Sequence, residues 1–413
     1  MDTFHYVDGE LCCEETPLRE VVRRCGTPAY VYSERHIVNR LEMLRGSLEA
    51  VDHLVCFSVK SNSNRGVLGI MARESMGADI VSGGELYRAL AAGIDPRKIV
   101  FSGVGKTAGE IRYALESDIL MFNVESEPEL EVIEQTAGQL RTIAPIAFRI
   151  NPDIDARTHR HTTTGKKETK FGVPLSRARS LYRKAAELPH VNPIGIDVHL
   201  GSPILSLEPY RAALEILSEL IDTLAADGIR IRILDIGGGL GITYHREEPF
   251  TPMQFARLVL PYAQRKGLRL IVEPGRFVVG NAGALLTTVT YVKGTEGKTF
   301  YVCDAAMNDL FRPAFYEAYH SIVALRRTDD SPGTLPVDVV GPVCETSDTF
   351  AKAREMPPVA PGDAIAIVSA GAYGFTMASQ YNSRPRPCEV MVQGKEFSVV
   401  RRRETFEDLV RGE

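Results

Sequence analysis

Between residue 53 and about residue 273, short apolar runs alternate with amphipathic segments. There are eight runs, at residues 53–59, 78–81, 98–102, 119–124, 145–150, 193–200, 230–236 and 268–273. Between them, segments such as 84–93, 107–117 and 208–228 repeat apolar residues every three to four positions, which is typical of a helix with one buried face. Buried strands that are each followed by a helix predict parallel βα units.

Eight βα units close most simply into a barrel. We therefore predict the fold class α/β, with a (β/α)8 barrel of the TIM type over residues 31–274. An open, doubly wound parallel sheet is the alternative arrangement of the same pattern.

The pattern changes after residue 275. Short β-type runs broken by glycine and proline follow at 284–294, 298–305, 337–344, 363–374 and 388–400, and they predict an all-β domain, a sandwich or a small β-barrel. Residues 308–325 can supply one helical excursion. Residues 1–30 have no βα partner, so we expect them to join residues 275–413 in the β domain.

Composition narrows the class of protein. The 413 residues are 44% hydrophobic and 24% charged, which is typical of a globular protein with a large core. A net charge of −5 argues against nucleic acid as a partner, since phosphate binding needs a basic surface. No apolar stretch approaches about 18 residues, so no membrane span is expected.

The cysteines and the first residues bear on localisation. Seven cysteines are present and none forms a C-x-x-C pair, so we expect reduced thiols and no metal site. The start, MDTFHYVDGE, has no basic segment followed by an apolar run, so we expect no signal peptide. A cytoplasmic protein is the simplest interpretation.

Polar and glycine residues gather where the predicted strands end. In a parallel barrel the loops at the carboxyl ends of the strands build the active site. The residues are Lys60 after the first run, Asp79, Ser82 and Gly83–Gly84 at the second, His199 and Ser202 at the sixth, Gly237–Gly241 after the seventh, and Glu273–Arg276 at the eighth.

Each of these signals is weak alone. A lysine after a strand is usually a solvated surface residue. A glycine run is more often a tight turn than a phosphate site, and GGGLG matches neither G-x-G-x-x-G nor a P-loop. His199 could be a core histidine, and Glu273 could be part of a loop salt bridge.

Together the residues fit one ligand, pyridoxal 5'-phosphate. The glycines of Gly237–Gly239 would let backbone N–H groups approach a phosphate, at or near a helix start. An ionised Glu273 could pair with a protonated pyridine nitrogen, and His199 offers a flat ring for stacking. Desolvation of Lys60 would lower its pKa for Schiff-base formation.

The order of the motifs resembles that of the diaminopimelate decarboxylases, pyridoxal-phosphate enzymes of the alanine-racemase-like fold group. The resemblance runs from about residue 25 to 385. Its motifs are FSVKSNSN, GADIVSGGEL, KIVFSGVGKT, NPDIDARTH with TKFG, DVHLGS, DIGGGLGI, EPGR, MNDLFRPAFYEAYH, GPVCETSDTF and AGAYG. The resemblance implies decarboxylation of meso-2,6-diaminopimelate to L-lysine and CO2, with reaction at the D-configured centre.

The resemblance also implies roles for single residues in cofactor binding. Lys60 is similar to the Schiff-base lysine, His199 to the ring-stacking histidine and Glu273 to the partner of the pyridine nitrogen. The other cofactor-binding residues that it implies, the phosphate ligands among them, are Asp79, Ser202, Gly238, Gly239, Gly275, Arg276 and Tyr373.

A further set of residues is implied in substrate binding and catalysis. The groups that resemble substrate ligands are Arg276, Arg312, Tyr316, Glu345 and Tyr373. Arginine and tyrosine suit the far carboxylate of the substrate and Glu345 suits its far ammonium. Cys344 resembles the proton donor, and the Cys344–Glu345 segment of such enzymes reaches the site of the neighbouring subunit, which implies a homodimer with shared active sites.

Simpler roles for these residues stay open on the sequence alone. Arg312 could form an exposed surface ion pair, and Cys344 could be a small buried hydrophobic residue. Ser61 stands where alanine is common in the family, and Pro203 where glutamine is frequent, which puts the local shape of the cofactor pocket in doubt.

Three rival functions remain. One is a pyridoxal-phosphate-binding relative without catalytic activity, and another is a racemase of the same fold, which typically presents arginine rather than a residue like Glu273 to the pyridine nitrogen. The third is a decarboxylase for another diamino acid.

Overall fold

The structure, a computed structural model, describes residues 3–156, 164–166, 168–327 and 333–413. The chain divides into two compact units. The barrel unit consists of Arg40–Gly241 and Glu248–Phe277, and the β unit of Met1–Asn39, Ile242–Glu247 and Val278–Glu413. The end of the motif NPDIDARTH, from residue 157, lies outside the described residues.

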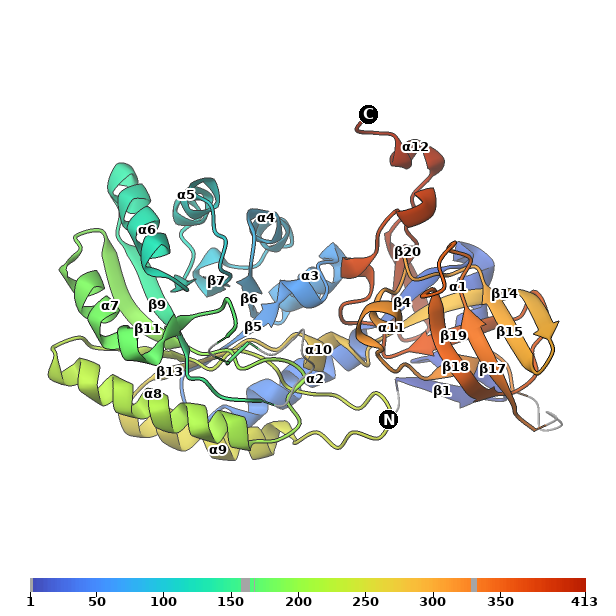
Figure 1. Ribbon diagram of the computed structural model, residues 1–413, viewed down its shortest axis with the longest axis horizontal. Coiled ribbons are helices and arrows are strands. Elements are labelled where there is room, and N and C mark those ends of the chain that lie inside the picture. The colour runs from blue at the N-terminus through green and yellow to red at the C-terminus, as the bar shows by residue number, and fades with distance from the viewer. Residues whose placement is uncertain (1–2, 157–163, 167, 328–332) are drawn as a thin grey trace. The chain divides into compact units, whose positions relative to one another are not determined.

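The barrel unit is built on eight parallel strands that form a closed ring (Figure 1). In ring order they are β5 (His53–Ser58), β6 (Gly77–Ile80), β7 (Ile99–Phe101), β8 (Met121–Val124), β9 (Ala144–Asn151), β11 (Val191–Asp197), β12 (Ile233–Asp235) and β13 (Arg269–Val272). Residues 122–124 of β8 pair with residues 146–148 of β9, and β13 pairs with β5. The predicted barrel is therefore confirmed, and the open sheet is wrong.

Helices follow the strands along the chain and lie outside the ring in Figure 1. Capping boxes at Thr107 and Thr251 begin α5 and α9, and Gly267 ends α9 in the left-handed conformation. The helices of this unit are α3 (Arg65–Arg73), α4 (Gly83–Ala91), α5 (Ala108–Glu116), α6 (Glu127–Leu140), α7 (Leu175–Glu187), α8 (Glu208–Ala226) and α9 (Pro252–Lys266), with the 3-10 turns η1 (Val59–Ser61) and η2 (Pro96–Lys98). The chain crosses from one unit to the other within α2 (Glu34–Ser47) and within α10 (Arg276–Val279). The short strand β10 (Val173–Pro174) pairs in parallel with the end of β9.

The interior of the barrel changes from apolar to polar along the strands. Side chains two positions apart on a strand point to the same side. Six residues of the apolar interior are Cys56, Val100, Met121, Ala147, Ile233 and Ile271. Two positions beyond each of these, and beyond Gly77 and Gly195, stands a buried polar residue. We call these eight residues the polar layer: Ser58, Asp79, Ser102, Asn123, Arg149, Asp197, Asp235 and Glu273.

The β unit contains a nine-stranded sheet and a small three-stranded sheet. The long strand β14 (Gly283–Thr295) pairs with β4 (Ala29–Ser33), β15 (Lys298–Cys303) and β19 (Ala364–Val368). The remaining strands of the large sheet are β16 (Ile322–Ala324), β17 (Leu335–Val340), β18 (Thr349–Met356), β20 (Cys388–Gln393) and β21 (Glu396–Arg401). The small sheet consists of β1 (Phe4–Val7), β2 (Glu10–Cys13) and β3 (Thr16–Pro17).

Short helices connect these strands. The helical excursion predicted within residues 308–325 is confined to α11 (Arg312–Tyr316), because Glu317 takes a left-handed conformation that ends the helix. The others are α1 (Leu18–Cys25), α12 (Phe406–Leu409), η3 (Phe375–Met377) and η4 (Tyr381–Ser383).

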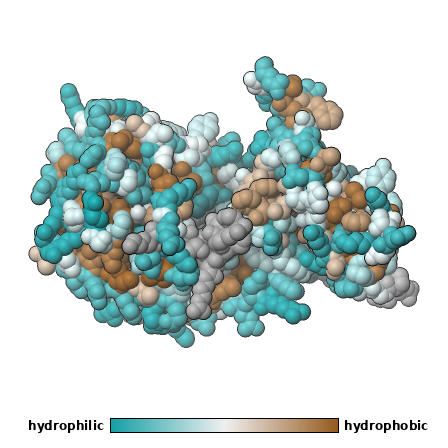
Figure 2. Space-filling model, viewed as in Figure 1, coloured by the Kyte–Doolittle hydropathy of each residue, from teal (hydrophilic) through white to brown (hydrophobic). Residues whose placement is uncertain are grey.

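Figure 2 shows polar residues over most of the visible surface of each unit. In the described part of the chain, no helix is both long enough and apolar enough to span a membrane. All seven cysteines lie within the described residues, and all are free thiols.

Candidate active site

A cavity of about 390 Å³ lies within the barrel unit and is lined by residues of the polar layer and of the loops that follow the strands. Its walls include Lys60, Arg149, Phe171, Asp197, His199 and Glu273. The structure thus brings together the predicted Schiff-base lysine, the predicted stacking histidine and the predicted partner of the pyridine nitrogen.

Lys60 lies in η1, directly after β5, and its Nζ forms an ion pair with Oδ2 of Asp79. The Asp79 side chain is fully buried, whereas 34% of the Lys60 side chain is exposed. Ser58 Oγ also donates to Asp79 Oδ2, at 2.7 Å. The sequence predicted a lysine perturbed by desolvation alone, but the structure places its amine beside a buried carboxylate, which can orient the amine and accept a proton from it.

His199 presents a neutral ring to the cavity. Its Nδ1 accepts a hydrogen bond from the backbone N–H of Gly238 at 3.1 Å. Burial, together with the charges of Arg149 and Lys60, lowers the pKa of His199 well below its ordinary value. A flat, uncharged imidazole in this position suits stacking on an aromatic ring.

Glu273 is only 3% exposed, and its Oε1 lies 3.4 Å from Nδ2 of Asn123. Burial and the charges of Asp235 and Asp79 raise the pKa of Glu273 well above its ordinary value. The predicted ionised state is therefore not the one that the protein alone favours. A protonated pyridine nitrogen would supply the missing positive charge, so the site fits this part of pyridoxal phosphate.

The triglycine loop packs tightly against neighbouring strands. A Cβ at Gly238 would lie 2.1 Å from the carbonyl oxygen of Glu273, and one at Gly239 would lie 2.4 Å from that of Gly201. Gly239 also has a φ of +99°. The expected helix start is wrong, because the next helix, α9, begins only at Pro252. Close approach of the backbone remains the feature of the loop that suits a phosphate.

The remaining predicted cofactor residues of the barrel unit surround this loop. Arg276 Nε donates to Ser202 Oγ at 3.3 Å, at the start of the four-residue helix α10. A Cβ at Gly275 would lie 2.9 Å from the side chain of Ser61. Ser61, the departure from the family pattern, is buried and donates from Oγ to the carbonyl of Ser58 at 2.7 Å. The serine is thus accommodated by a local hydrogen bond.

Sequence reasoning missed part of the polar layer. Asn123 Nδ2 lies 3.1 Å from Ser102 Oγ and 3.3 Å from Asp235 Oδ2, in addition to its contact with Glu273. Carboxylate oxygens of Asp197, Asp235 and Glu273 lie within 4.8 Å of one another. The signal was available, because each of these polar residues stands two positions beyond an inward-facing apolar residue or glycine.

Arg312, from the β unit, is buried at 6% exposure as the first residue of α11. Its Nη1 donates to Nε2 of His320 at 2.7 Å, and its guanidinium lies 4.6 Å from the ring centroid of Tyr244. The alternative of an exposed ion pair is therefore wrong. Tyr316, the last residue of the same helix, is half-buried.

Cys344 and Glu345 are exposed side chains of the β unit. The alternative of a buried thiol at Cys344 is therefore wrong. Tyr381 OH donates to Glu345 Oε2 at 2.7 Å, and Ser347 Oγ donates to Glu345 Oε1 at 2.6 Å. These two bonds, with that of Ser347 the stronger cause, lower the pKa of Glu345. Asn382 Oδ1 accepts from the backbone N–H of Cys344 at 3.0 Å.

The sequence did not point to Tyr381 and Asn382, because exposed residues outside the strands and long helices carry no periodic signal.

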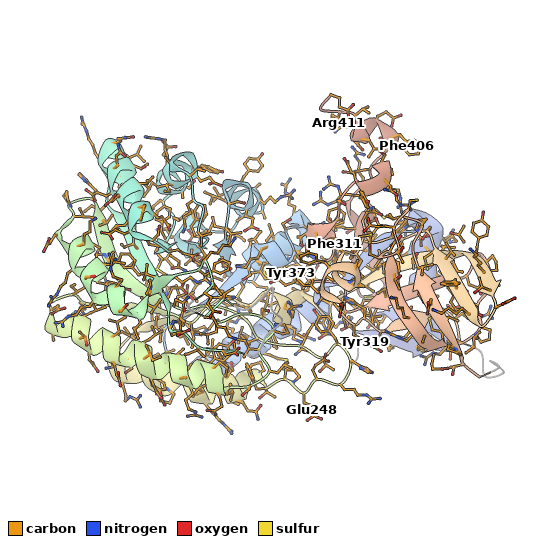
Figure 3. All side chains as sticks on the ribbon, viewed as in Figure 1. Glu248, Phe311, Tyr319, Tyr373, Phe406 and Arg411 are labelled. Atoms are coloured by element: carbon orange, nitrogen blue, oxygen red, sulfur yellow. The ribbon has the colours of Figure 1, made fainter. Side chains whose placement is uncertain are left out.

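Tyr373 lies in the loop after β19, half-buried and with a left-handed φ of 55°, and Figure 3 labels it. A Cβ at the adjacent Gly374 would lie 2.4 Å from the carbonyl oxygen of Ala370, so the loop is compact. The predicted site residues therefore form two sets, one in each unit.

Comparison with known proteins agrees with this arrangement. Residues 34–280 match the family described as pyridoxal-dependent decarboxylase, pyridoxal binding domain. Diaminopimelate decarboxylase of Pseudomonas aeruginosa is 50% identical over 413 residues, which cover 100% of this chain and 99% of that protein.

Solved structures give the same result. The crystal structure of diaminopimelate decarboxylase from Helicobacter pylori complexed with L-lysine is 43% identical, with a TM-score of 0.92 over 95% of this chain and 98% of that one. That of the M. jannaschii enzyme in co-complex with L-lysine is 35% identical, with a TM-score of 0.94 over 99% of this chain and 97% of that one. The predicted resemblance, enzyme class and cofactor, pyridoxal phosphate, are confirmed, and the chain belongs to the diaminopimelate decarboxylases, a family of pyridoxal-dependent decarboxylases.

Proposed function

We propose that this protein decarboxylates meso-2,6-diaminopimelate to L-lysine and CO2, using pyridoxal phosphate. The observation that carries the proposal is a barrel cavity lined by Lys60, His199 and Glu273 together, in a chain 50% identical to a diaminopimelate decarboxylase. When bound, the cofactor supplies an aldehyde carbon for the substrate amine and a ring that accepts the electrons left when CO2 departs.

The barrel residues would bind the cofactor and would hold or transfer the protons on its nitrogen atoms. Lys60 would hold the cofactor at its aldehyde carbon through Nζ, and Asp79, its ion-pair partner, would accept and return a proton at that nitrogen. Glu273 holds a proton on the pyridine nitrogen, which strengthens the electron-accepting character of the ring. His199 covers one face of the ring and excludes water from it.

The β unit recognises the far end of the substrate. Arg312 and Tyr316, with Arg276 of the barrel unit, bind the far carboxylate, for which guanidinium offers two parallel donors. Glu345 binds the far ammonium. Its lowered pKa keeps it ionised at neutral pH. Cys344 delivers a proton to the α-carbon, either from Sγ or through a water that it positions.

We assign the same division of labour to the predicted domains. Residues 31–274 form the cofactor-binding barrel, and residues 1–30 and 275–413 provide substrate and dimer contacts together with the cofactor ligands Gly275, Arg276 and Tyr373. Because all seven cysteines are free thiols, we infer a cytoplasmic enzyme. We also infer that it binds neither nucleic acid nor a membrane.

We propose a homodimer in which each subunit provides Cys344 and Glu345 to the site of the other. Their exposure in the single chain favours this. Mixing inactive Lys60→Ala and Glu345→Gln proteins under conditions that exchange subunits should restore activity, because each mixed dimer then carries one intact site. Equal activity before and after mixing would contradict shared sites.

The substrate is tested by side-by-side turnover of meso-diaminopimelate, lysine, ornithine and arginine. We expect diaminopimelate to exceed the others by a wide margin in kcat/KM, because only it offers both a far carboxylate and a far ammonium. A better rate with another diamino acid would favour the alternative function, decarboxylation of that amino acid. No turnover of any of them would favour a non-catalytic relative.

A further inference from the structure

Three acids of the polar layer lie so close together that they would repel one another if all three were ionised. Asp197, Asp235 and Glu273 are 1%, 0% and 3% exposed, and one carboxylate oxygen of each lies within 4.8 Å of the other two. Asp197 and Asp235 end the neighbouring strands β11 and β12, and Glu273 directly follows the next strand, β13, so the barrel itself fixes their separation. Three negative charges at this distance, on side chains this deeply buried, repel one another strongly.

The bases near the cluster are already matched to other acids. Lys60 pairs with Asp79, and Arg149 Nη1 donates to Glu125 Oε1 at 3.1 Å. The ionisable groups that face the cluster from the surrounding strands and loops are Cys56, Lys60, Asp79, Glu125, Arg149 and His199. In this set the carboxylates of Asp79 and Glu125 balance the cations of Lys60 and Arg149, so no net positive charge is left for the cluster. Burial lowers the pKa of His199 and raises that of Cys56, which favours the neutral form of both.

The acceptor oxygens in and around the cluster have too few hydrogen-bond donors. The Oδ1 atoms of Asp197 and Asn123 are buried and accept no hydrogen bond from the described residues. Asp235 accepts from the backbone N–H of Gly237 at 3.0 Å and from Asn123. Hydrogens on the carboxyl groups would reduce both the charge and the shortage of donors. Burial and mutual repulsion also raise the pKa of all three acids well above the ordinary range.

We propose that Asp197, Asp235 and Glu273 form a proton store under the ring nitrogen of bound pyridoxal phosphate. Before the cofactor binds, the three carboxyls share two protons. When the ring binds, one O–H bond of the store breaks and an N–H bond forms with the lone pair of the ring nitrogen. Glu273 is left as a carboxylate, and the other proton stays between Asp197 and Asp235.

The inference rests on the proposed function in one respect, that Glu273 meets the ring nitrogen. It adds that Asp197 and Asp235 are positioning residues. They determine how many protons Glu273 and the ring nitrogen share. The proton on the ring nitrogen therefore comes from the protein rather than from the medium.

Infrared difference spectroscopy on the full-length protein, freed of cofactor and then given pyridoxal phosphate, tests the store. A protonated carboxyl absorbs separately from a carboxylate. At neutral pH we expect protonated-carboxyl absorption in the cofactor-free protein, and loss of the equivalent of about one carboxyl group when the cofactor binds. Absorption only by carboxylates before binding, or no loss on binding, would overturn the proposal.

Variants identify the groups. Asp197→Asn and Asp235→Asn should each begin with about one protonated carboxyl fewer than the wild type, and the cluster absorption should then vanish when the cofactor binds. Glu85→Gln is the matched control, since burial raises the pKa of Glu85 to about 7 and this residue lies outside the cluster. It should leave the cofactor-dependent loss unchanged. If the cofactor-dependent loss of absorption disappeared in Glu85→Gln, the proton would come from Glu85 and not from the cluster.

The wild-type measurement decides the question even if a variant fails to fold. Failure of the inference is also distinct from failure of the proposed function. A protein that develops the visible absorbance of bound pyridoxal phosphate without losing protonated carboxyl contradicts only the store, whereas a protein that binds no cofactor contradicts the proposed function.

Discussion

The barrel unit and the β unit hold their candidate site residues in different ways. In the barrel unit the residues are the last inward-facing positions of buried strands or stand directly after them, so the ring of eight strands fixes their separations. In the β unit, Arg312 and Tyr316 begin and end a five-residue helix, and Cys344, Glu345 and Tyr373 lie on loops.

This difference agrees with the chemistry that we assign to each unit. Cofactor chemistry needs charges at fixed positions in a dry site, which a closed ring of strands supplies. Recognition of a far carboxylate or ammonium depends on a short helix and on loops. Such connecting segments vary more readily than the strands that carry them. Variants of Lys60 and of the polar layer should therefore affect every substrate, and variants of Arg312 and Glu345 should affect some substrates more than others.

The largest effect is expected for Lys60→Ala. The variant should lose the visible absorbance of bound cofactor, and turnover should fall by about four orders of magnitude or more for any amino acid, because the covalent attachment is gone. Absorption spectra and single-turnover assays measure both. Lys98→Ala, which removes only a bond to the backbone of Ser75, is the control and should behave as wild type. Retained turnover in Lys60→Ala would remove this residue from the mechanism.

Arg312→Lys should reduce kcat/KM for meso-diaminopimelate by about 100-fold, chiefly through KM, since an ammonium cannot offer two parallel donors to a carboxylate. The residual rate with lysine, which has no far carboxylate, should change much less. The exposed Arg402→Lys serves as control. Equal losses with both substrates would show that Arg312 acts on the fold and not on the substrate.

Asp197→Asn should change how stability depends on pH in the cofactor-free protein. Burial raises the pKa of Asp197 in the folded state, so the wild type binds this proton more tightly when folded and loses stability as pH rises from about 3.9 toward the raised value. The amide removes that dependence. Denaturant unfolding should show little difference at low pH and about 1–2 kcal/mol greater stability of the variant at alkaline pH. A variant that is less stable at alkaline pH would indicate an ionised Asp197.

The smallest effect is expected for Tyr381→Phe, which removes one of two hydrogen bonds that hold Glu345. KM for meso-diaminopimelate should rise about three- to ten-fold while kcat stays nearly constant. Tyr87→Phe, a change at a side chain that is 67% exposed, is the control. A fall in kcat with unchanged KM would place Tyr381 in the chemical step instead.

The barrel could be predicted from the sequence because its signals are local and repeated. Eight apolar runs gave the eight strands, and the residues at their ends gave Lys60, His199 and Glu273. Side chains alternate between the inside and the outside of the barrel along each strand. This alternation would also have predicted Asn123, Asp197 and Asp235, since each stands two positions beyond an inward-facing residue. The prediction failed where it relied on a helix start after Gly239, because the loop continues to Thr251 before the chain turns helical.

The loops of the β unit could be predicted only by resemblance. The contact of Glu345 with Tyr381 joins exposed residues 36 positions apart, and no hydrophobic period marks either of them. Nor did the sequence reveal that Asp79 pairs with Lys60 or that burial and neighbouring acids raise the pKa of Glu273. Both depend on burial and on charges from other strands, which only the closed ring brings together.

The central claim is that the barrel cavity holds pyridoxal phosphate on Lys60 with its ring nitrogen at Glu273. Borohydride reduction of the cofactor-loaded protein, followed by peptide mapping, tests it most directly. We predict one phosphopyridoxyl group per chain, on Lys60, and a weaker cofactor affinity in Glu273→Gln with the label still on Lys60. A label on another lysine, or none, would contradict the account.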